Sequence, residues 1–173
     1  MSTYVITGGA NGIGLATADI LRARGDTVHV IDREGGDIIA DLGSTAGRTF
    51  AVRRVHELCP DGIDGLACVA GISTPKPDNG SILSINYFGT LAIANGLFPL
   101  LEKRRGSCVI TSSASITWVR PGSGGHIAEL LCDCGDEERI VALANSFPPD
   151  APYNMYTSSK IALARWARRV SIE

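Results

Sequence analysis

Apolar and polar positions follow two periods along the chain. Runs of consecutive apolar, often β-branched residues predict buried strands at residues 4–6, 27–31, 37–40, 66–70 and 107–111. Between them, apolar residues recur at helical spacing over residues 15–24, 44–58 and 82–102, and a last helix is predicted from residue 152 to the end. Strands separated by helices of this length predict an α/β fold, a doubly wound parallel sheet of the Rossmann type.

Individual residues set the ends and faces of these helices. Gly25 is a natural stop for the first helix, and Ser44 is suited to cap the second. The positions expected to face the core are Leu15, Ala18 and Leu21, then Phe50, Val55 and Leu58, and then Ile85, Phe88, Leu91 and Ile93.

One segment departs from the alternation of strands and helices. Residues 116–152 carry no strand signal, and a glycine-rich bend at 121–125 leads into helix-like stretches at 127–131 and 137–147. We therefore expect a helical insertion before the last helix, serving as a lid, an oligomer contact or both.

Composition limits the classes of function. A length of 173 residues fits one domain over residues 1–173, and 45% hydrophobic and 20% charged residues are ordinary globular values. A net charge of −2 does not supply the basic stripe that a nucleic-acid partner requires. No apolar run approaches a membrane span, and the chain enters its first strand without a leader peptide. We expect a cytoplasmic protein with no membrane partner.

The five cysteines do not form a metal-binding pattern. Cys68 and Cys108 lie in apolar strand-like runs, where a thiol usually acts as a small buried hydrophobe. Cys132 and Cys134 are separated by one residue, which is not the usual zinc spacing, and no second pair accompanies them. We predict reduced, structural thiols and no metal site.

A glycine-rich turn follows the first strand and opens the first helix. Its sequence is Thr7-Gly8-Gly9-Ala10-Asn11-Gly12-Ile13-Gly14. Glycines in this setting let backbone amides approach a pyrophosphate at a helix N-terminus. The position between strand and helix makes the turn a candidate dinucleotide site formed by Gly8, Asn11, Gly12, Ile13 and Gly14.

Further residues are expected to contact the cofactor or to set the choice between NAD and NADP. Asp32 ends the second strand, where a carboxylate accepts hydrogen bonds from ribose hydroxyls and repels a 2′-phosphate, so NAD is expected in preference to NADP. The neighbouring Arg33 could accommodate that phosphate, and Asp32 could instead be a solvated loop carboxylate. Asp41-Leu42 is expected near the adenine, and Ala70-Gly71 ends the fourth strand with small residues beside which the cofactor can pass.

Candidate reacting groups lie in the second half of the chain. Tyr156 and Lys160 are four residues apart, on one face of a helix, and a fixed ammonium beside a phenol favours the phenolate. Ser112 and Ser113 compete for a place at the carboxyl end of the fifth strand, the edge where ligands bind in such sheets. Asn86 is a polar residue inside an apolar helix, and it could serve chemistry, bend the helix or pack.

In this order, the glycine turn, Asn86-Tyr87-Phe88-Gly89, Ser112 and Tyr156-x-x-x-Lys160 resemble the short-chain dehydrogenase/reductase family. The resemblance implies NAD-dependent hydride transfer between nicotinamide and an alcohol or ketone. In that role Tyr156 is the acid/base and Ser112 binds the substrate oxygen. Lys160 supports the tyrosine and holds the nicotinamide ribose, which Tyr156 also borders, while Asn86 anchors a proton-relay water.

The long gap between Ser112 and Tyr156, together with Ile39-Ala40-Asp41-Leu42 and Val69-Ala70-Gly71, points to the hydroxysteroid-type branch of the family. The family continues beyond the active-site helix with two more strands and a substrate loop, so the resemblance implies a fold truncated after that helix. It also implies a homodimer or homotetramer. The alternative is a truncated, catalytically inactive protein that binds a dinucleotide or a partner.

Overall fold

A computed structural model describes residues 1–73, 78–118, 125–133, 135–148 and 155–171. The chain divides into two compact units, Met1–Ala70 with Gly89–Thr111, and Gly71–Phe88 with Ser112–Glu173. The prediction of a single domain over residues 1–173 stays a prediction. The glycine-rich bend at 121–125, except for its last residue, and the expected helix start at Pro152 lie outside the described residues.

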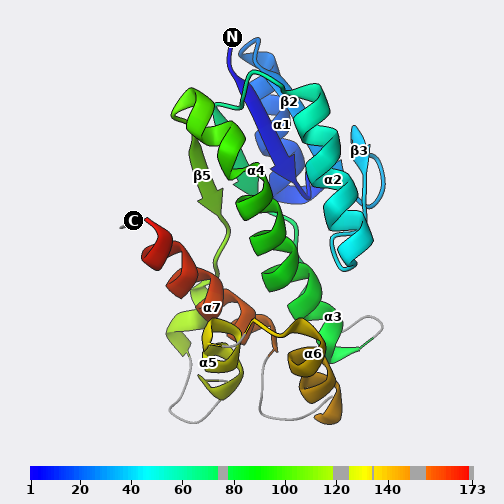
Figure 1. The fold of residues 1–173 in the computed structure, drawn as a ribbon, viewed down its shortest axis with the longest axis vertical. Helices are drawn as coiled ribbons and strands as arrows, with labels where there is room; N and C mark the ends of the chain where they lie inside the picture. The colour runs from blue at the N-terminus through cyan, green and yellow to red at the C-terminus, as the bar shows by residue number, and fades with distance from the viewer. Residues whose placement is uncertain (74–77, 119–124, 134, 149–154, 172–173) are drawn as a thin grey trace. The chain divides into compact units, whose positions relative to one another are not determined.

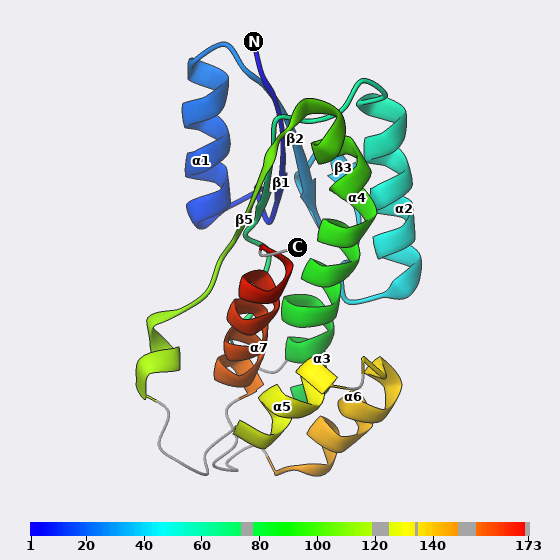
Figure 2. The same cartoon turned by 60° about the vertical axis from the view of Figure 1, so that its left-hand side comes forward.

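The first unit is a parallel sheet with helices on both faces, as predicted. Its described strands pair in the order β3-β2-β1-β4-β5. They are β1 (Thr3–Thr7), β2 (Thr27–Asp32), β3 (Ile38–Ile39), β4 (Gly65–Cys68) and β5 (Ser107–Ile110). Helix α1 (Gly12–Ala23) lies on one side of the sheet, and α2 (Thr45–Leu58) and α4 (Thr90–Arg104) lie on the other (Figures 1 and 2).

Alternation along the strands builds a core on each face of this sheet. On the α1 face, Ile6, Val28 and Val30 pack with Ala18, and Ala67 and Val69 lie against that cluster. The next residue along each strand, such as Val5, Ile31 or Leu66, is also buried. Burial on both faces explains why these strands appear in the sequence as continuous apolar runs.

Several predicted core positions are wrong. Leu15 is 38% exposed on α1, and Phe50 and Leu58 are exposed on α2. The buried residues of α2 are Arg48, Ala51 and Val55. Helical spacing alone cannot show which of two adjacent apolar faces of a helix is covered by the rest of the protein. On α2 the face with Phe50 and Leu58 is the exposed one. Ser44 does cap α2, because its side chain accepts a hydrogen bond from Gly47 N at 3.1 Å.

The predicted long helix over residues 82–102 is confirmed as part of a longer helical stretch that contains a π-helical turn. Its described course runs through α3 (Asn79–Leu83), a π-helical turn η1 (Ser84–Gly89) and then α4. The stretch Asn79–Arg104 is the one described helix long and apolar enough to cross a membrane, which the sequence interpretation did not anticipate. The most apolar part of this helix is 61% buried inside the structure. Core helices that are mostly buried have the same length and composition, so these two properties do not by themselves indicate a membrane span.

The second unit is helical. It holds α3, η1, a 3₁₀ turn η2 (Ala114–Trp118), α5 (Gly125–Asp133), α6 (Glu137–Ser146) and α7 (Met155–Val170). Helix α7 packs against α3, α5 and η2, and α6 packs against α3 and α5 (Figures 1 and 2). The helices α5 and α6 confirm the two helix-like stretches of the insertion, and their apolar faces bury Ile127, Leu131 and Ile140.

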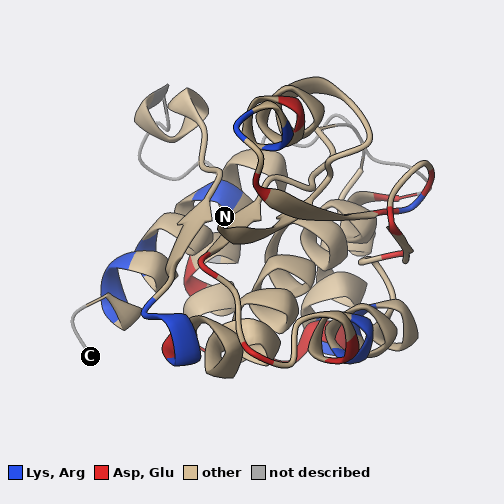
Figure 3. Cartoon of the chain, turned by 90° about the horizontal axis from the view of Figure 1, so that it is seen from above, with Lys and Arg blue, Asp and Glu red and all other residues tan. Residues whose placement is uncertain are grey.

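Charged side chains are distributed unevenly over the described elements. Helix α7 carries Lys160, Arg165, Arg168 and Arg169 and no acidic residue, whereas elsewhere Lys and Arg lie among Asp and Glu (Figure 3). On α2, for example, Arg53 and Arg54 both pair with Glu57.

Candidate active site

Helix α7 carries the predicted tyrosine and lysine. Tyr156 and Lys160 lie one turn apart, and Lys160 Nζ is 5.7 Å from the centre of the Tyr156 ring. The lysine side chain is buried in the unit, at 4% exposure, whereas Tyr156 is half-buried. An ammonium in this position is attracted to the ring face and stabilises negative charge that develops on the phenol oxygen.

The two candidate serines behave differently. Ser112 Oγ donates to the backbone carbonyl of Lys160 at 3.3 Å, which brings this hydroxyl to α7. Ser113 Oγ accepts from Ser115 N at 3.1 Å and so closes a local turn. Ser112 is therefore the serine that lies beside the Tyr156–Lys160 helix.

Asn86 lies in the π-helical turn and is fully buried. Its Oδ1 accepts from Ile72 N at 2.8 Å, and its Nδ2 donates to Ile72 O at 2.9 Å and to Ser159 Oγ at 3.3 Å. The wider π turn changes which way the side chain projects relative to a regular α-helix. The asparagine thus connects the segment after β4 to α7.

Gly71 lies between these groups. A Cβ added at Gly71 would be 3.0 Å from Asn86 Oδ1 and 3.7 Å from Lys160 Nζ. The second unit therefore brings Gly71, Asn86, Ser112, Tyr156 and Lys160 together within their own packed helices and loops.

The predicted dinucleotide residues lie in the first unit. Gly8 has a φ of +73°, and a Cβ there would come within 2.7 Å of the Ala70 backbone. A Cβ at Gly14 would lie 2.1 Å from Gly8 O, so α1 can pack against the turn only through glycine. The turn and Ala70 therefore lie in close backbone contact.

The N-terminus of α1 suits a bound pyrophosphate. Asn11 precedes the helix but makes no side-chain cap, and the first turn contains no acidic residue. Gly12 and Ile13 are exposed, and a Cβ at Gly12 would meet nothing within 4 Å. Backbone amides at such a terminus favour an anion, so the residues present fit the diphosphate of a dinucleotide.

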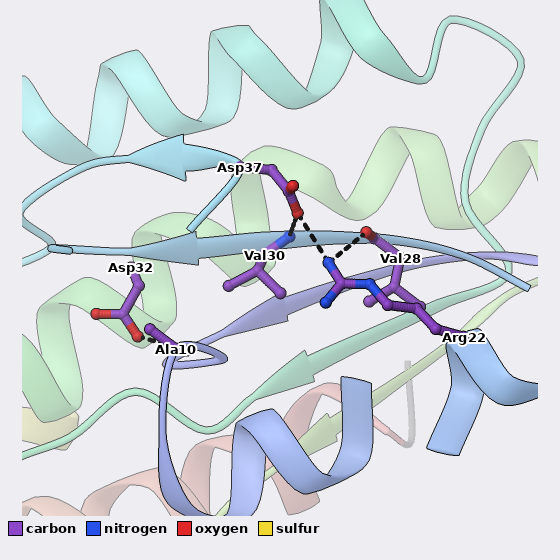
Figure 4. A network of polar contacts seen from close by, with 6 residues as sticks. All are labelled: Ala10, Arg22, Val28, Val30, Asp32 and Asp37. Atoms are coloured by element: carbon purple, nitrogen blue, oxygen red, sulfur yellow. Dashed lines mark hydrogen bonds and ion pairs between the residues drawn. The ribbon is translucent and has the colours of Figure 1, made fainter. Parts of the chain in front are cut away.

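Asp32 lies against this turn. Its Oδ2 accepts from Ala10 N at 3.0 Å and its Oδ1 accepts from Arg33 N at 2.7 Å (Figure 4). A carboxylate has about four acceptor positions, so the two bonds leave capacity for ribose hydroxyls. The half-buried Asp32 is thus tied to the glycine turn rather than being a solvated loop residue.

A second carboxylate fixes the course of β2 nearby. Asp37 Oδ2 accepts from Val30 N at 2.8 Å and pairs with Arg22 of α1 at 3.1 Å, and Arg22 also donates to Val28 O at 3.2 Å (Figure 4). Because β3 has two residues, these side chains bond backbone groups of β2 that the short strand does not reach. They also attach the end of α1 to the sheet.

The segment predicted to face the adenine is held by an arginine. Asp41 is exposed and its Oδ1 accepts from Gly43 N at 2.9 Å, while Leu42 is buried. Arg48, itself 6% exposed, donates to Leu42 O at 2.6 Å and to Gly43 O at 3.4 Å. The loop after β3 is therefore shaped by a buried guanidinium on α2.

Three supporting residues were not assigned from the sequence. These are Arg48, Ser159, whose Oγ donates to Tyr156 O at 2.7 Å, and Thr7, whose Oγ1 accepts from Val69 N and Ala70 N. Thr7 could have been found as a polar residue at the end of an apolar strand. Arg48 and Ser159 occupy positions of the helical pattern where polar residues usually face solvent, so the sequence held no signal for them.

No group of three or more His, Cys, Asp or Glu side chains suited to a metal ion occurs within the described ranges. The expectation that the protein has no metal site stays a prediction.

Known proteins are similar to the chain along nearly its whole length. No protein-family model matches the chain. It is 32% identical to the 3-alpha-hydroxysteroid dehydrogenase/carbonyl reductase of Comamonas testosteroni, over 98% of this chain and 65% of that protein. It is 28% identical to a coniferyl-alcohol dehydrogenase of a Pseudomonas species, over 95% of this chain and 63% of that protein.

Solved structures agree with these relatives. The crystal structure of a Pseudomonas 3-alpha-hydroxysteroid dehydrogenase complexed with NADH matches with a TM-score of 0.89 and 36% identity, over 99% of this chain and 66% of that one. A short-chain dehydrogenase/reductase from Brucella ovis matches with a TM-score of 0.70 and 25% identity, over 98% of this chain and 75% of that one.

The resemblance to the short-chain dehydrogenase/reductase family is thereby confirmed in both sequence and fold. Within the family, the similarity to 3-alpha-hydroxysteroid dehydrogenase/carbonyl reductase proteins is also confirmed. The chain spans slightly less than two thirds of the length of both curated relatives.

Proposed function

We propose that this chain carries the dinucleotide site and the reacting groups of an NAD-dependent oxidoreductase. Its reaction is hydride transfer between nicotinamide and an alcohol or ketone of the hydroxysteroid or aromatic-alcohol type. The observation that carries the proposal is the convergence of Asn86, Ser112, Tyr156 and Lys160 in one packed unit, with Ser112 bonded to the backbone of Lys160.

Each reacting group has a distinct task. Tyr156 gives a proton to the substrate oxygen or takes one from it, which requires a hydroxyl that the substrate oxygen can reach within hydrogen-bond distance. Ser112 donates to the same oxygen and stabilises its developing charge. Lys160, buried under the tyrosine ring, supplies a fixed positive charge, and Asn86 holds the backbone around Ile72.

The first unit is assigned to the cofactor. Gly8, Gly12 and Gly14 allow the diphosphate to approach the uncapped terminus of α1, and Asp32 accepts from the ribose hydroxyls. NAD supplies or accepts the hydride when bound. The position of Asp32 at the glycine turn supports NAD rather than NADP, since a carboxylate there repels a 2′-phosphate.

The names of the relatives support the substrate class. One acts, by name, on 3-alpha-hydroxysteroids and carbonyl compounds and another on coniferyl alcohol. We expect the helices α5 and α6, which pack against α7 and α3 in the second unit, to contribute to the substrate's surroundings. By the same resemblance, we propose a homodimer or homotetramer, which light scattering after size-exclusion chromatography tests directly.

The experiment combines cofactor binding with turnover. NADH and NADPH are titrated by calorimetry, and reduction of NAD is followed with a panel containing a 3-hydroxysteroid, coniferyl alcohol and a simple secondary alcohol. We expect NADH to bind more tightly than NADPH, and Tyr156→Phe to lose turnover by about 10²–10⁴-fold while keeping NADH affinity. Tyr4→Phe, on β1, is the matched control and should behave as the unmodified protein.

Each readout can contradict a different part of the proposal. Full turnover in Tyr156→Phe would exclude the assigned acid/base. Binding of NADH without turnover of any substrate would favour the non-catalytic dinucleotide-binding alternative, and absence of dinucleotide binding would overturn the proposal as a whole.

A further inference from the structure

Two cysteines lie next to each other on neighbouring strands of the first unit. The register of β4 and β5 pairs Leu66 with Cys108 and Cys68 with Ile110. Because residues two apart on a strand share a face, Cys68 and Cys108 project from the same face of the sheet, one diagonal step apart. The proposed function uses neither thiol, so a role for this pair is independent of that function.

The two thiols differ in access. Ala67 and Val69 lie against the cluster under α1, so Cys68 and Cys108 are on the opposite face. Cys68 is 3% exposed, whereas Cys108 is exposed, which corrects the prediction that both would be buried. An incoming reagent therefore meets Cys108 first and finds Cys68 behind it.

The contact between the two thiols also affects the pKa of Cys108. The Cys68 thiol hydrogen-bonds to Cys108, which lowers the pKa of the Cys108 thiol below its ordinary value, and partial burial opposes this effect. At Cys59, by contrast, burial raises the pKa of the thiol. Since the thiolate is the nucleophile, Cys108 is the more readily activated of these two cysteines.

The diagonal spacing decides what the pair can bind. Adjacent strands lie about 4.8 Å apart and rise about 3.3 Å per residue, so an offset of two residues puts the Cα atoms roughly 8 Å apart. A disulfide requires Cα atoms closer than roughly 7 Å. An atom bonded to both sulfurs spans a longer gap than a direct sulfur–sulfur bond. Zinc requires about four ligands, and the described residues offer no group of three that could hold a metal ion. A monosubstituted trivalent arsenical requires two sulfurs, since its remaining bond is to its own carbon.

We propose that Cys68 and Cys108 form a dithiol site that chelates monosubstituted trivalent arsenicals. With an arsenoxide, the Cys108 thiolate bonds to arsenic and the Cys68 sulfur closes the chelate. Two arsenic–sulfur bonds form, and the arsenic–oxygen bond breaks. The oxygen leaves as water with the two thiol protons, and neither arsenic nor sulfur changes oxidation state.

Phenylarsine oxide is the probe, and intact-mass spectrometry of the folded protein is the readout. We expect one phenylarsenic adduct per chain, with loss of one water, that survives excess glutathione and is removed by dithiothreitol. A chelate resists a monothiol because both of its bonds must be replaced. Peptide mapping should locate the adduct on the peptides containing Cys68 and Cys108.

Single substitutions assign the site. Cys68→Ser and Cys108→Ser should each abolish the glutathione-resistant adduct, whereas the matched control Cys132→Ser, which breaks the Cys132-x-Cys134 pair, should retain it. A resistant adduct in Cys108→Ser, loss of the adduct in Cys132→Ser, or no adduct in the unmodified protein would each overturn the proposal. Circular dichroism checks folding, and if Cys68→Ser unfolds, the exposed Cys108→Ser variant decides the result.

Discussion

The side-chain amide of Asn86 makes two hydrogen bonds to the backbone of Ile72: its oxygen accepts from the Ile72 N–H at 2.8 Å, and its nitrogen donates to the Ile72 carbonyl at 2.9 Å. The two bonds satisfy both the N–H and the carbonyl of Ile72, as a neighbouring β-strand would. Asn86→Ala should therefore reduce the free energy of unfolding by about 1–3 kcal/mol, because buried polar groups lose their partners. Urea denaturation measures it. Asn95→Ala, at an exposed site on α4, should change stability by less than about 0.5 kcal/mol, and equal effects of the two substitutions would contradict the finding.

Substitution by alanine should have different effects on stability at Gly8 and Gly35, although the two glycines have similar backbone angles. Gly8 and Gly35 have φ values of +73° and +71°, but a Cβ at Gly8 would meet the Ala70 backbone at 2.7 Å and one at Gly35 the Ala10 side chain at 3.5 Å. Gly35→Ala should cost about 1 kcal/mol from its backbone angle alone. Gly8→Ala should cost clearly more and abolish NADH binding, as measured by thermal unfolding and NADH titration. An equal loss of stability in both variants would mean that the close approach of Gly8 to the Ala70 backbone does not restrict the residue at position 8.

Arg48 predicts a link between a buried cation and cofactor affinity. Arg48→Met removes the donors to Leu42 O and Gly43 O, so we expect a stability loss of about 1–3 kcal/mol and weaker binding of NADH. Binding of nicotinamide mononucleotide, which lacks the adenosine half, should change less. Arg53→Met on the exposed side of the same helix is the control. If NADH and the mononucleotide weaken equally in Arg48→Met, the loop after β3 does not contact the adenosine.

Ser159 predicts an effect on proton transfer rather than on binding. Its hydroxyl donates to Tyr156 O at 2.7 Å and accepts from Asn86 Nδ2 at 3.3 Å, so Ser159→Ala loosens the turn that carries Tyr156. We expect kcat to fall about 3–10-fold, corresponding to roughly 1 kcal/mol, with a displaced pH profile and an unchanged Kd for NADH. Ser146→Ala removes a hydroxyl with the same local bond on α6 and should leave both unchanged. A change confined to Kd would exclude this positioning role.

The thiols of the first unit predict a specific pH dependence. Because its bond to Cys68 lowers the pKa of Cys108, the Cys108 thiolate forms at lower pH than an ordinary thiol with a pKa of 9.0. Alkylation of Cys108 by iodoacetamide should therefore reach half its maximal rate below pH 9.0 in the native protein. In Cys68→Ala the hydrogen bond is lost and the profile should move to higher pH, while Cys59→Ser should leave it unchanged. An identical profile in Cys68→Ala would show that the bond does not set the Cys108 pKa.

The alternation of strands and helices was predictable because strands buried on both faces must be apolar throughout, as Val5, Ile6 and Leu66 are. The glycine turn was predictable because the requirement at Gly8 and Gly14 is local and steric. The pairing of Tyr156 with Lys160 followed from helical geometry alone.

What escaped prediction depends on contacts between distant segments. Phe50 has the same local pattern as Val55, yet it is exposed, because the neighbours of α2 cover a different stripe. The π-helical turn around Asn86 could not be predicted, because the apolar residues around it have the same spacing as in a regular α-helix. Arg48 is buried because its partners are the carbonyls of Leu42 and Gly43, and a count of hydrophobic residues does not register backbone acceptors.

Tyr87 gives the insertion a consequence for evolution and engineering. This buried tyrosine, next in sequence to Asn86, donates its hydroxyl to the carbonyl of Leu131 in α5 at 2.8 Å. An insertion of different length or sequence that lacks this acceptor would cost the buried Tyr87 hydroxyl a hydrogen bond, which destabilises the fold. The insertion is therefore not a freely exchangeable module. A chimaera that imports another insertion should also import its partner at position 87.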